Sequence, residues 1–400
     1  MSKSPYLAGR HFLQIPGPTP IPDRIQQAMA RPIMDHRSQE FAAFSTKLLH
    51  DLKDVFKTNN PVIMFPSSGT GAWEAALTNT LSPGDKIVMF ETGQFSMLWQ
   101  VMAERLGLSV DYIQSDWRIG VDAAAIAERL SADKAHEIKA VAIVHNETAT
   151  GCSSPVEDVR KALDAADHPA LLMVDTISSL GCFDYQHDAW GVDVTVCGSQ
   201  KGLMLPPGLS FTAVSDKALQ VSKSSRLPSA FFSWDDMLAP NAKGFYPYTP
   251  AITLMYGLEE ALKMLNEEGL DNVFARHAKL ASGVRAAVAA WGLENQCRDA
   301  KYFSNAVTSI RMPEGHSADQ FRKLVLENFN MSLGAGLTKV ADKVFRIGHL
   351  GDTNELTIIG ALGGVEMGLE MARVPHSQGG VDAAMAEFRR WGRTDQAAAA

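Results

Sequence analysis

The sequence predicts an α/β protein: helices cover both sides of a mainly parallel sheet in a large domain, and a smaller α+β domain follows. Strand and helix signals alternate between residues 86 and 174, as they do where helical crossovers join parallel strands. Apolar runs such as 171–174 end in a polar residue, which is typical of buried strands. Long helical segments after residue 250 lead into a region with fewer strand signals. We therefore expect an extended N-terminal segment (1–22), a large domain (23–267) and a small C-terminal domain (268–400).

The composition limits the kinds of partner that suit this chain. Its 400 residues, 46% of them hydrophobic, can form a sizeable core. The net charge of -8 argues against nucleic acid or an anionic membrane as the main partner. Residues 1–10 lack the apolar centre of a signal peptide, and no apolar run approaches about 18 residues. We expect a cytoplasmic protein that does not enter a membrane. The four cysteines show no C-x-x-C spacing, so we expect reduced thiols and no metal site.

The first 65 residues predict one extended segment, two helices and a strand. Proline and glycine are frequent up to residue 22, and the sequence PGPTP at 16–20 is too stiff for a helix. Asp23 is a candidate N-cap for a helix through Met34, and Ser38 for a second helix with apolar residues at helical spacing. The apolar run 62–65 is a short strand.

A turn of small residues, PSSGTG at 66–71, follows this strand and leads into a helical composition at 72–77. A strand, such a turn and a helix N-terminus present free backbone N–H groups and a positive dipole end, which suit a phosphate group. The turn lacks the G-K-S/T of a nucleoside-triphosphate loop and the G-x-G-x-x-G of a dinucleotide fold. The phosphate of another ligand is therefore expected here.

The next strands each carry a polar or aromatic residue just beyond their ends. Phe95 follows the strand 86–90, where an aromatic residue either joins the core or forms a stacking surface. The sequence HNETATG at 145–151 follows the strand 140–144, and we expect His145 to be structural. In such sheets, ligands collect beyond the carboxyl ends of the strands.

Two further strand signals, 171–174 and 192–197, are followed by residues of opposite charge: Asp175 ends the first, and Lys201 lies just beyond the second. Pyridoxal phosphate needs a lysine to hold it as a Schiff base and a carboxylate to keep its ring nitrogen protonated. Taken alone, Asp175 could cap a helix and Lys201 could lie on the surface. Small or polar residues flank the lysine, however, and a rigid PPG turn follows at 206–208, which favours a pyridoxal-phosphate site.

The C-terminal half predicts a strand at 209–214 and an irregular stretch, 227–249, whose exposed aromatic residues suggest an interface or a lid. Two long helices, 251–267 and 270–291, lead into the small domain. Taken alone, Arg346, in a strand at 344–347, suggests a surface residue or a structural ion pair. The other elements expected in this domain are a strand at 306–311 and helices at 318–327, 355–371 and 381–391.

Segments in a fixed order along the chain resemble the class V, fold-type I pyridoxal-phosphate aminotransferases, and within them the serine–glyoxylate group with its alanine– and aspartate–glyoxylate relatives. The segments are PGPTP (16–20), DHR (35–37), SSGTG (67–71), HNETATG (145–151), VDTISSLG (174–181), GSQKG (198–202), YPYTP (246–250) and FRIGH (345–349). Together they span nearly the whole chain.

The resemblance implies a role for each matching residue, and it implies that the N-terminal segment crosses towards the active site. Lys201 would carry the cofactor and then act as general base, while Asp175 would hold the ring nitrogen. Arg346 would bind the substrate α-carboxylate through two parallel hydrogen bonds. Tyr246 and Thr249 would reach the phosphate bound by the other subunit, so the site would require a homodimer. The remaining implied cofactor contacts are Ser68, Gly69 and Thr70 at the phosphate, Phe95 against the ring, Thr148 near the phenolic oxygen, and Gln200.

The implied reaction is ping-pong transamination between an L-amino acid and glyoxylate. The group that the sequence resembles most uses L-serine, which would give hydroxypyruvate and glycine. Aspartate or alanine remain alternative donors; an aspartate donor would want a second cation, for which His36 and Arg37 are candidates. A cysteine desulfurase would need a reactive cysteine in a mobile Gly/Ser-rich loop of the small domain, and none of the four lies in one. A non-catalytic interaction protein would be expected to have lost Lys201, Asp175 or Arg346.

Overall fold

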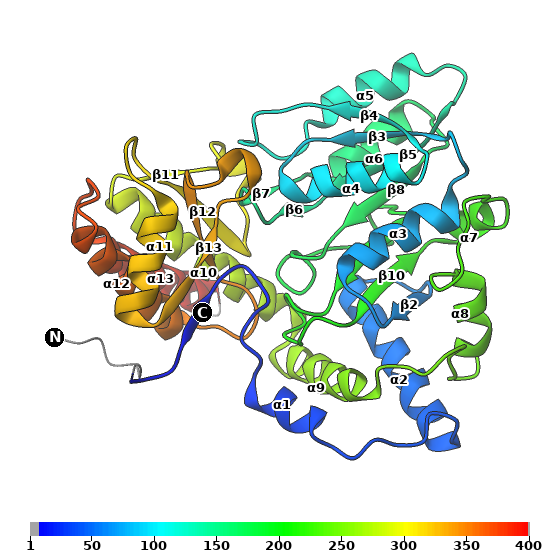
Figure 1. Cartoon of the computed structure of the whole chain (residues 1–400), viewed down its shortest axis with the longest axis horizontal. Helices are drawn as coiled ribbons and strands as arrows, with labels where there is room; N and C mark the ends of the chain where they lie inside the picture. The colour runs from blue at the N-terminus through cyan, green and yellow to red at the C-terminus, as the bar shows by residue number, and fades with distance from the viewer. Residues whose placement is uncertain (1–7, 399–400) are drawn as a thin grey trace.

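The computed structural model describes residues 8–398 and contains two main sheets, each in its own half of the molecule (Figure 1). The larger sheet has seven strands. β10 pairs antiparallel with both of its neighbours, and the other pairs are parallel. The prediction of a mainly parallel sheet is therefore confirmed. In spatial order the strands are β2 (Val62–Phe65), β10 (Ser210–Val214), β9 (Val194–Gly198), β8 (Leu171–Asp175), β5 (Ile138–Val144), β3 (Lys86–Phe90) and β4 (Ser109–Ile113).

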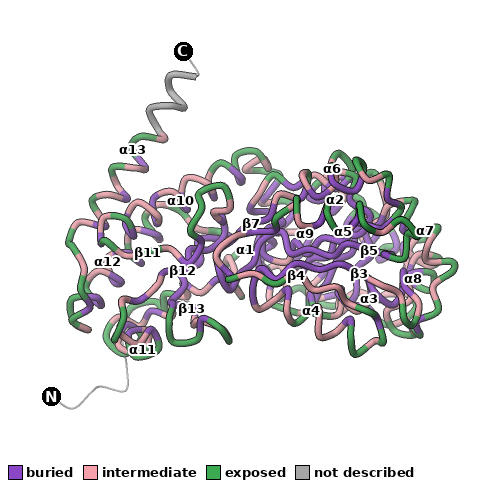
Figure 2. The backbone as a smooth tube through the Cα atoms, turned by 90° about the horizontal axis from the view of Figure 1, so that it is seen from above, coloured by how far each residue is buried: buried purple, intermediate pink, exposed green. Residues whose placement is uncertain are grey.

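Alternate residues of each strand point into two different cores. Val62 and Met64 of β2 pack into one core, whereas Ile63 and Phe65 pack into the other. Because both faces are covered, most of the strands are almost wholly buried, as the purple centre of Figure 2 shows, whereas the edge strand β4 is only partly buried. The first core is covered by α1 (Asp23–Met29), α2 (Gln39–Phe56), α5 (Ala123–Ala132), α6 (Val156–Ala165) and α9 (Ile252–Glu268), and the second by α3 (Gly69–Thr80), α4 (Gln94–Arg105), α7 (Asp216–Ser222) and α8 (Trp234–Asn241).

The second half of the molecule is a five-stranded sheet with helices packed against it (Figure 1, yellow to red). Its first strand comes from the N-terminal segment, because Phe12 pairs in parallel with Met331. The strands are β1 (Phe12–Gln14), β13 (Met331–Ala335), β14 (Val344–Gly348), β12 (Val307–Arg311) and β11 (Glu294–Asn295), and the helices are α10 (Leu270–Ala290), α11 (Ala318–Phe329), α12 (Glu355–Met371) and α13 (Gly380–Ala398).

α9 belongs to the first core, and α10 belongs to the core of the small sheet except at its start, where Leu270 and Val273 pack with the first core. On this basis we propose that the chain divides as expected, at 1–22, 23–267 and 268–400. Residues 1–7 of that N-terminal segment lie outside the described residues.

Several details of the predicted elements were wrong. The first helix begins with Asp23 as its first helical residue, so its N-cap is Pro22 and not Asp23. It ends at Met29, not Met34, because Pro32 disfavours a helical conformation at the residue before it. The stretch 227–249 contains α8, whose Trp234 is fully buried rather than exposed, and the Ser233 hydroxyl caps this helix at the N–H of Asp236. β13 was not expected at all, because its short sequence becomes a strand through pairing with β1 and β14.

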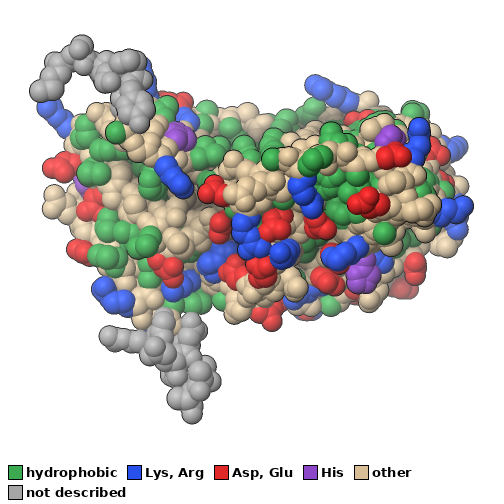
Figure 3. Space-filling model, turned by 90° about the horizontal axis from the view of Figure 1, so that it is seen from below, with side chains coloured by type: hydrophobic (Ala, Val, Ile, Leu, Met, Phe, Trp, Pro, Cys, Tyr) green, Lys and Arg blue, Asp and Glu red, His purple; other side chains and the backbone are tan. Residues whose placement is uncertain are grey.

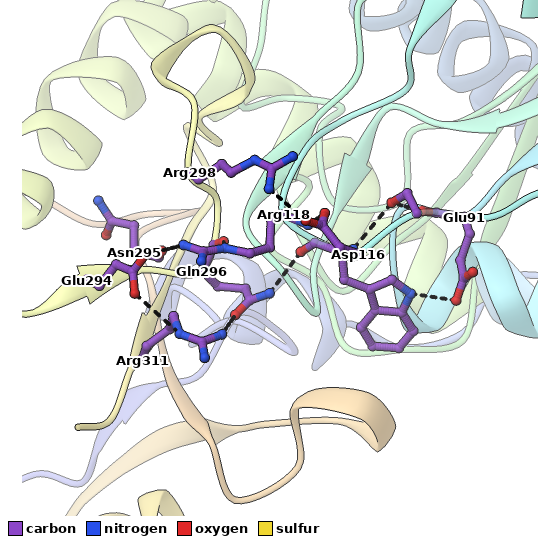
Figure 4. Close-up of polar contacts among 10 residues, drawn as sticks. Glu91, Asp116, Arg118, Glu294, Asn295, Gln296, Arg298 and Arg311 are labelled. Carbon is purple, nitrogen blue, oxygen red and sulfur yellow. Dashed lines mark hydrogen bonds and ion pairs between the residues drawn. The ribbon is translucent and has the colours of Figure 1, made fainter. Parts of the chain in front are cut away.

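Polar contacts join the two halves beside β4. Arg298 contacts Asp116 (Nη1 to Oδ2, 2.7 Å), and the side-chain amide of Gln296 donates to the Trp117 carbonyl at 2.9 Å. The Arg118 guanidinium donates in turn to the Gln296 carbonyl at 3.1 Å (Figure 4). These bonds tie the loop after β4 to the segment after β11.

On the face shown in Figure 3, basic and acidic side chains are interspersed rather than gathered by sign. Arg24, for example, pairs with both Glu260 and Glu267. Within residues 8–398, no helix has both the length and the apolar composition needed to cross a membrane.

Candidate active site

A cavity of about 240 Å³ opens beyond the carboxyl ends of β5 and β8. Eight residues expected at the cofactor line it: Ser68, Gly69, Thr70, Phe95, Thr148, Asp175, Gln200 and Lys201. The other lining residues are Gly17, Pro18, Trp73, Val144, Asn146, Ile177 and Ser178. Segments far apart in the sequence thus meet at one edge of the sheet, where such folds bind ligands.

Lys201 lies in the turn after β9, and its side chain is buried. Its ammonium group donates a hydrogen bond to the carbonyl of Pro16. Burial, reinforced by the positive charge of Arg346, lowers the pKa of Lys201 to about 8. At neutral pH a usable fraction of this amine is therefore unprotonated, as a base requires.

Asp175, the last residue of β8, is buried at the same cavity. Its Oδ2 accepts the indole N–H of Trp73 at 2.8 Å, and its Oδ1 accepts the backbone N–H of Ile177 at 2.7 Å. Burial raises the pKa of Asp175 to about 7, although both hydrogen bonds and Lys201 act in the opposite direction. A nearby cationic ring nitrogen would favour its ionised form.

The N-terminus of α3 points at the cavity. Ser68 is the N-cap residue, but its side chain makes no capping bond within the described part of the chain. Gly69 has no room for a side chain, since a Cβ atom there would lie 2.3 Å from Cδ1 of Ile177. The backbone thus approaches the cavity closely with the first N–H groups of the helix, the arrangement that binds phosphate.

Phe95 stands at the start of α4 and lines the same cavity. The backbone N–H groups of Phe95 and Ser96 donate to Oε2 of Glu147 at 3.1 and 3.2 Å. Glu147 is fully buried, and burial raises its pKa to about 7. This carboxylate fixes the start of the helix that carries Phe95.

Thr148 and Asn146 share a hydrogen-bonded cluster with Ser178. The Thr148 hydroxyl donates to Ser178 Oγ at 2.7 Å, and the Asn146 amide donates to the same atom at 2.8 Å. Among the described residues, Oδ1 of Asn146 and Oε1 of Gln200 have no hydrogen-bond partner although both are buried. Because both residues line the cavity, these oxygens are acceptors available to a ligand.

Arg346 approaches the cavity from β14 of the small sheet. Its Nη1 donates to the Thr148 carbonyl at 2.8 Å, and its Nε donates to the Ala335 carbonyl at 2.7 Å. Burial lowers the pKa of Arg346 to about 10, which leaves it charged at neutral pH. Arg346 does not itself line the cavity, but Thr148 does, so this contact places the cation next to the cavity on the small-domain side.

Tyr246 and Thr249 do not line the cavity of their own chain. The Tyr246 ring packs edge-on against Phe41 with a centroid distance of 6.1 Å, and its hydroxyl lies beside Ser45. Thr249 is exposed. The candidate cations for an aspartate donor, His36 and Arg37, do not line the cavity either.

His145 is structural, as expected: it is buried, its Nδ1 lies 2.9 Å from Ser179 Oγ, and its pKa falls to about 4 through burial. The sequence reasoning missed the contributions of Trp73 and Ser178 to the cavity, whereas Gly17 lies in the N-terminal segment that the resemblance directed towards the site. For Trp73 a position just inside the helix after the phosphate-type turn was the available signal, but a tryptophan there suits a core equally well.

The residues present fit pyridoxal phosphate. The cavity combines a lysine amine, a buried carboxylate and a helix N-terminus with a glycine at the point of closest approach. Phe95 adds an aromatic side chain, and Gln200 and Asn146 add unpaired acceptors. These groups match the parts of that cofactor: the lysine suits the aldehyde, the carboxylate the ring nitrogen, the helix N-terminus the phosphate, and the aromatic side chain the ring face.

Comparisons with known proteins agree with this fit. A family model described as Aminotransferase class-V matches residues 15–349. A serine–glyoxylate aminotransferase of Hyphomicrobium methylovorum is 53% identical over 379 residues, 94% of each chain. An L-aspartate–glyoxylate aminotransferase of Paracoccus denitrificans is 47% identical over 378 residues, 94% of this chain and 96% of that protein. The solved structure of pyridoxamine–pyruvate aminotransferase from Mesorhizobium loti has a TM-score of 0.91 at 25% identity and covers 97% of this chain and 99% of that one. The chain belongs to the class-V aminotransferase family.

Proposed function

We propose that this aminotransferase uses pyridoxal phosphate to transfer the amino group of L-serine to glyoxylate, giving hydroxypyruvate and glycine. The observation that carries the proposal is that the Lys201 amine and the Asp175 carboxylate lie in one buried cavity. When bound, the cofactor supplies an electron sink for the bonds at the substrate α-carbon.

We assign the cofactor contacts as follows. Lys201 holds the aldehyde carbon, and the N-terminus of α3 with Ser68, Gly69 and Thr70 holds the phosphate. Asp175 keeps the ring nitrogen protonated. The remaining contacts are Phe95 on the ring face, Thr148 at the phenolic oxygen and Gln200 within the same cavity.

Two side chains then act on the amino acid. The Arg346 guanidinium binds the α-carboxylate and so orients the substrate, since a planar guanidinium forms paired charged hydrogen bonds with a carboxylate. The Nζ atom of Lys201, once free as an amine, takes the proton from the α-carbon; its lowered pKa supports this role. The second oxo acid reverses these steps.

Serine is proposed as the donor because the relative of that name is 53% identical over nearly the full length. Aspartate is the second candidate, since the aspartate–glyoxylate relative is 47% identical. Its side-chain carboxylate calls for a second cation, and neither His36 nor Arg37 lines the cavity within one chain. Alanine fits the same α-amino acid core and is a third candidate.

We also propose a homodimer in which Tyr246 and Thr249 contact the phosphate in the partner's cavity. Thr249 supports this arrangement, because it is exposed and lies outside the cavity of its own chain. The Tyr246 hydroxyl is buried beside Ser45, so the arrangement requires this side chain to turn towards the partner. We also propose amino acid and oxo acid substrates and a cytoplasmic location; the net charge of -8 argues against nucleic acid or an anionic membrane as the main partner.

The test is a half-reaction screen. The purified yellow protein is mixed with serine, aspartate or alanine separately, without an oxo acid, and the visible band of the lysine-linked cofactor is followed. Bleaching by serine and recovery on adding glyoxylate is the expected result. Bleaching by aspartate or alanine but not by serine would identify that amino acid as the donor in place of serine. A protein without any cofactor band would contradict the proposal.

A further inference from the structure

Residues 16–19, here called the strap, cross from the small sheet to the lysine turn (Figure 1, dark blue). At one end, the preceding strand β1 pairs with β13, and the side-chain amide of Gln14 donates to the Gly348 carbonyl at the end of β14. At the other end, the Thr19 backbone N–H donates to the Gln200 carbonyl at 3.1 Å. The strap therefore connects the strand that carries Arg346 to the turn that carries Lys201.

The strap contacts both the side chain and the backbone of Lys201. The Pro16 carbonyl accepts a hydrogen bond from Nζ, and the Thr19 hydroxyl donates to the Lys201 carbonyl at 3.4 Å. A Cβ atom on Gly17 would lie 2.4 Å from Cδ and 2.6 Å from Nζ of the lysine. Gly17 also has a φ of 99°, which other residues rarely adopt. No other residue type would leave both the strap and Lys201 where they are.

Glycines in the small sheet also leave room for the strap and for the residue before it. A Cβ atom on Gly334 would lie 2.8 Å from Cδ of Pro16 and 2.9 Å from Cβ of Arg346. A Cβ atom on Gly348 would lie 2.3 Å from the carbonyl of Ile15. The segment entering the strap thus packs directly against the backbone on both sides of Arg346, so its path depends on that strand.

We propose that the strap is a positioning element for Lys201: the Pro16 carbonyl holds the free amine, Gly17 sets the course of the side chain, and the small sheet fixes the strap beside Arg346. This inference rests on the proposed function in one respect, the role of Lys201. Beyond that role, the inference is that backbone atoms of the N-terminal segment set the direction in which the Lys201 amine points. The same atoms also keep water from the lysine.

The test compares Gly17→Ala with Gly9→Ala. Gly9 has a similar φ of 92°, but a Cβ atom there would meet nothing within 4 Å, so it carries the same backbone strain without the lysine contact. The full-length protein is freed of cofactor, treated with formaldehyde and cyanoborohydride across a pH series, and the methylation of Lys201 is measured by peptide mass spectrometry.

For Gly17→Ala we expect the pH of half-maximal methylation to rise by about one unit, because a displaced strap admits water and relieves the burial that lowers the lysine pKa. Gly9→Ala should match the parent protein. With cofactor restored, kcat of Gly17→Ala should fall at least about tenfold while its fold and thermal midpoint stay close to those of Gly9→Ala. Identical Lys201 methylation in both variants would overturn the proposal.

If Gly17→Ala does not fold, the same methylation experiment is done with Thr19→Val. This change removes the hydroxyl contact with the Lys201 carbonyl at nearly constant side-chain volume. A smaller shift in the same direction is expected, and no shift would overturn the proposal. The proposed function fails separately: a parent protein without a cofactor band would refute it, whereas the methylation comparison would still report whether the strap positions Lys201.

Discussion

The indole N–H of Trp73, in the second turn of α3, donates to Oδ2 of Asp175 at the end of β8 over 2.8 Å. Trp73 also stacks on Trp99 with a centroid distance of 5.9 Å, which limits the motion of the indole. The helix that presents its N-terminus to the cavity therefore also stabilises the ionised form of the carboxylate across from it.

Replacing Trp73 with Phe should lower kcat by about tenfold to a hundredfold, the range expected for losing a hydrogen bond to a charged group. The pKa of Asp175 should rise further, so the acidic limb of the pH–rate profile should move upward by about one unit. Trp234→Phe is the matched control, because Nε1 of this buried indole has no partner among the described residues. Equal profiles for the two variants would remove Trp73 from the site.

Asp175 should give the cofactor-free protein a specific pH dependence of stability. Its folded pKa of about 7 lies above the ordinary value of 3.8, so between these values the folded state binds more protons than the unfolded state. The stability of the parent protein relative to Asp175→Asn should therefore fall as pH rises from 4 to 7, by at most about 1.4 kcal/mol per unit, and then level off. Urea unfolding of both proteins at several pH values measures this difference, and parallel curves would contradict it.

Lys201→Ala should abolish the visible band of the bound cofactor, because no other amine lines the cavity within the described chain. Lys217→Ala is the control: this lysine donates to the Ala170 carbonyl at 2.9 Å and lies outside the cavity. Absorbance spectra after adding pyridoxal phosphate provide the measurement. A band that persists in Lys201→Ala would exclude this lysine as the attachment point.

Arg346→Lys should raise the KM for the amino acid by about ten- to a hundredfold, because a lysine cannot form paired hydrogen bonds with a carboxylate. The comparison is Arg322→Lys, which changes a second arginine of the small domain whose Nε donates to the Leu333 carbonyl at 2.9 Å. Steady-state kinetics with serine and with glyoxylate would measure the KM values of both variants. A KM unaffected in Arg346→Lys would assign substrate binding elsewhere.

The proposed sharing of sites between subunits can be tested by complementation. Lys201→Ala and the double variant Tyr246→Phe, Thr249→Ala are each expected to lose activity. Co-expressed, they should form mixed dimers with one intact site, so about a quarter of the normal sites should return with random pairing. Each variant expressed alone is the control. No recovery in verified mixed dimers would mean that each chain builds its own phosphate site.

The sequence predicted the part of the site that follows from strand order. Asp175 and Lys201 both come just after buried strands, and parallel strands bring such residues to one edge of a sheet. Phe95 could have been a core residue, and only its neighbours in space show that it lines the cavity. Arg346 alone suggested a surface position, because nothing local indicates that Thr148 lies beside it.

Contacts between distant segments could not be predicted in this way. The direction of the Trp73 indole depends on how α3 packs across β8, and the strap's contact with Lys201 depends on pairing between β1 and β13. Such pairing leaves no periodic signal in three residues of strand. Glycines 17, 334 and 348 are conspicuous only once their neighbours are known.

The pairing of β1 with β13 has a consequence for how the protein is made. β1 leaves the ribosome long before its partner strand, which begins at Met331. Closing so long a loop is slow, and β1 cannot be held in place while most of the chain is still being translated. The cover over Lys201 therefore forms late, and we expect nascent or truncated chains that end before β13 to leave this reactive amine open to solvent and to cellular aldehydes.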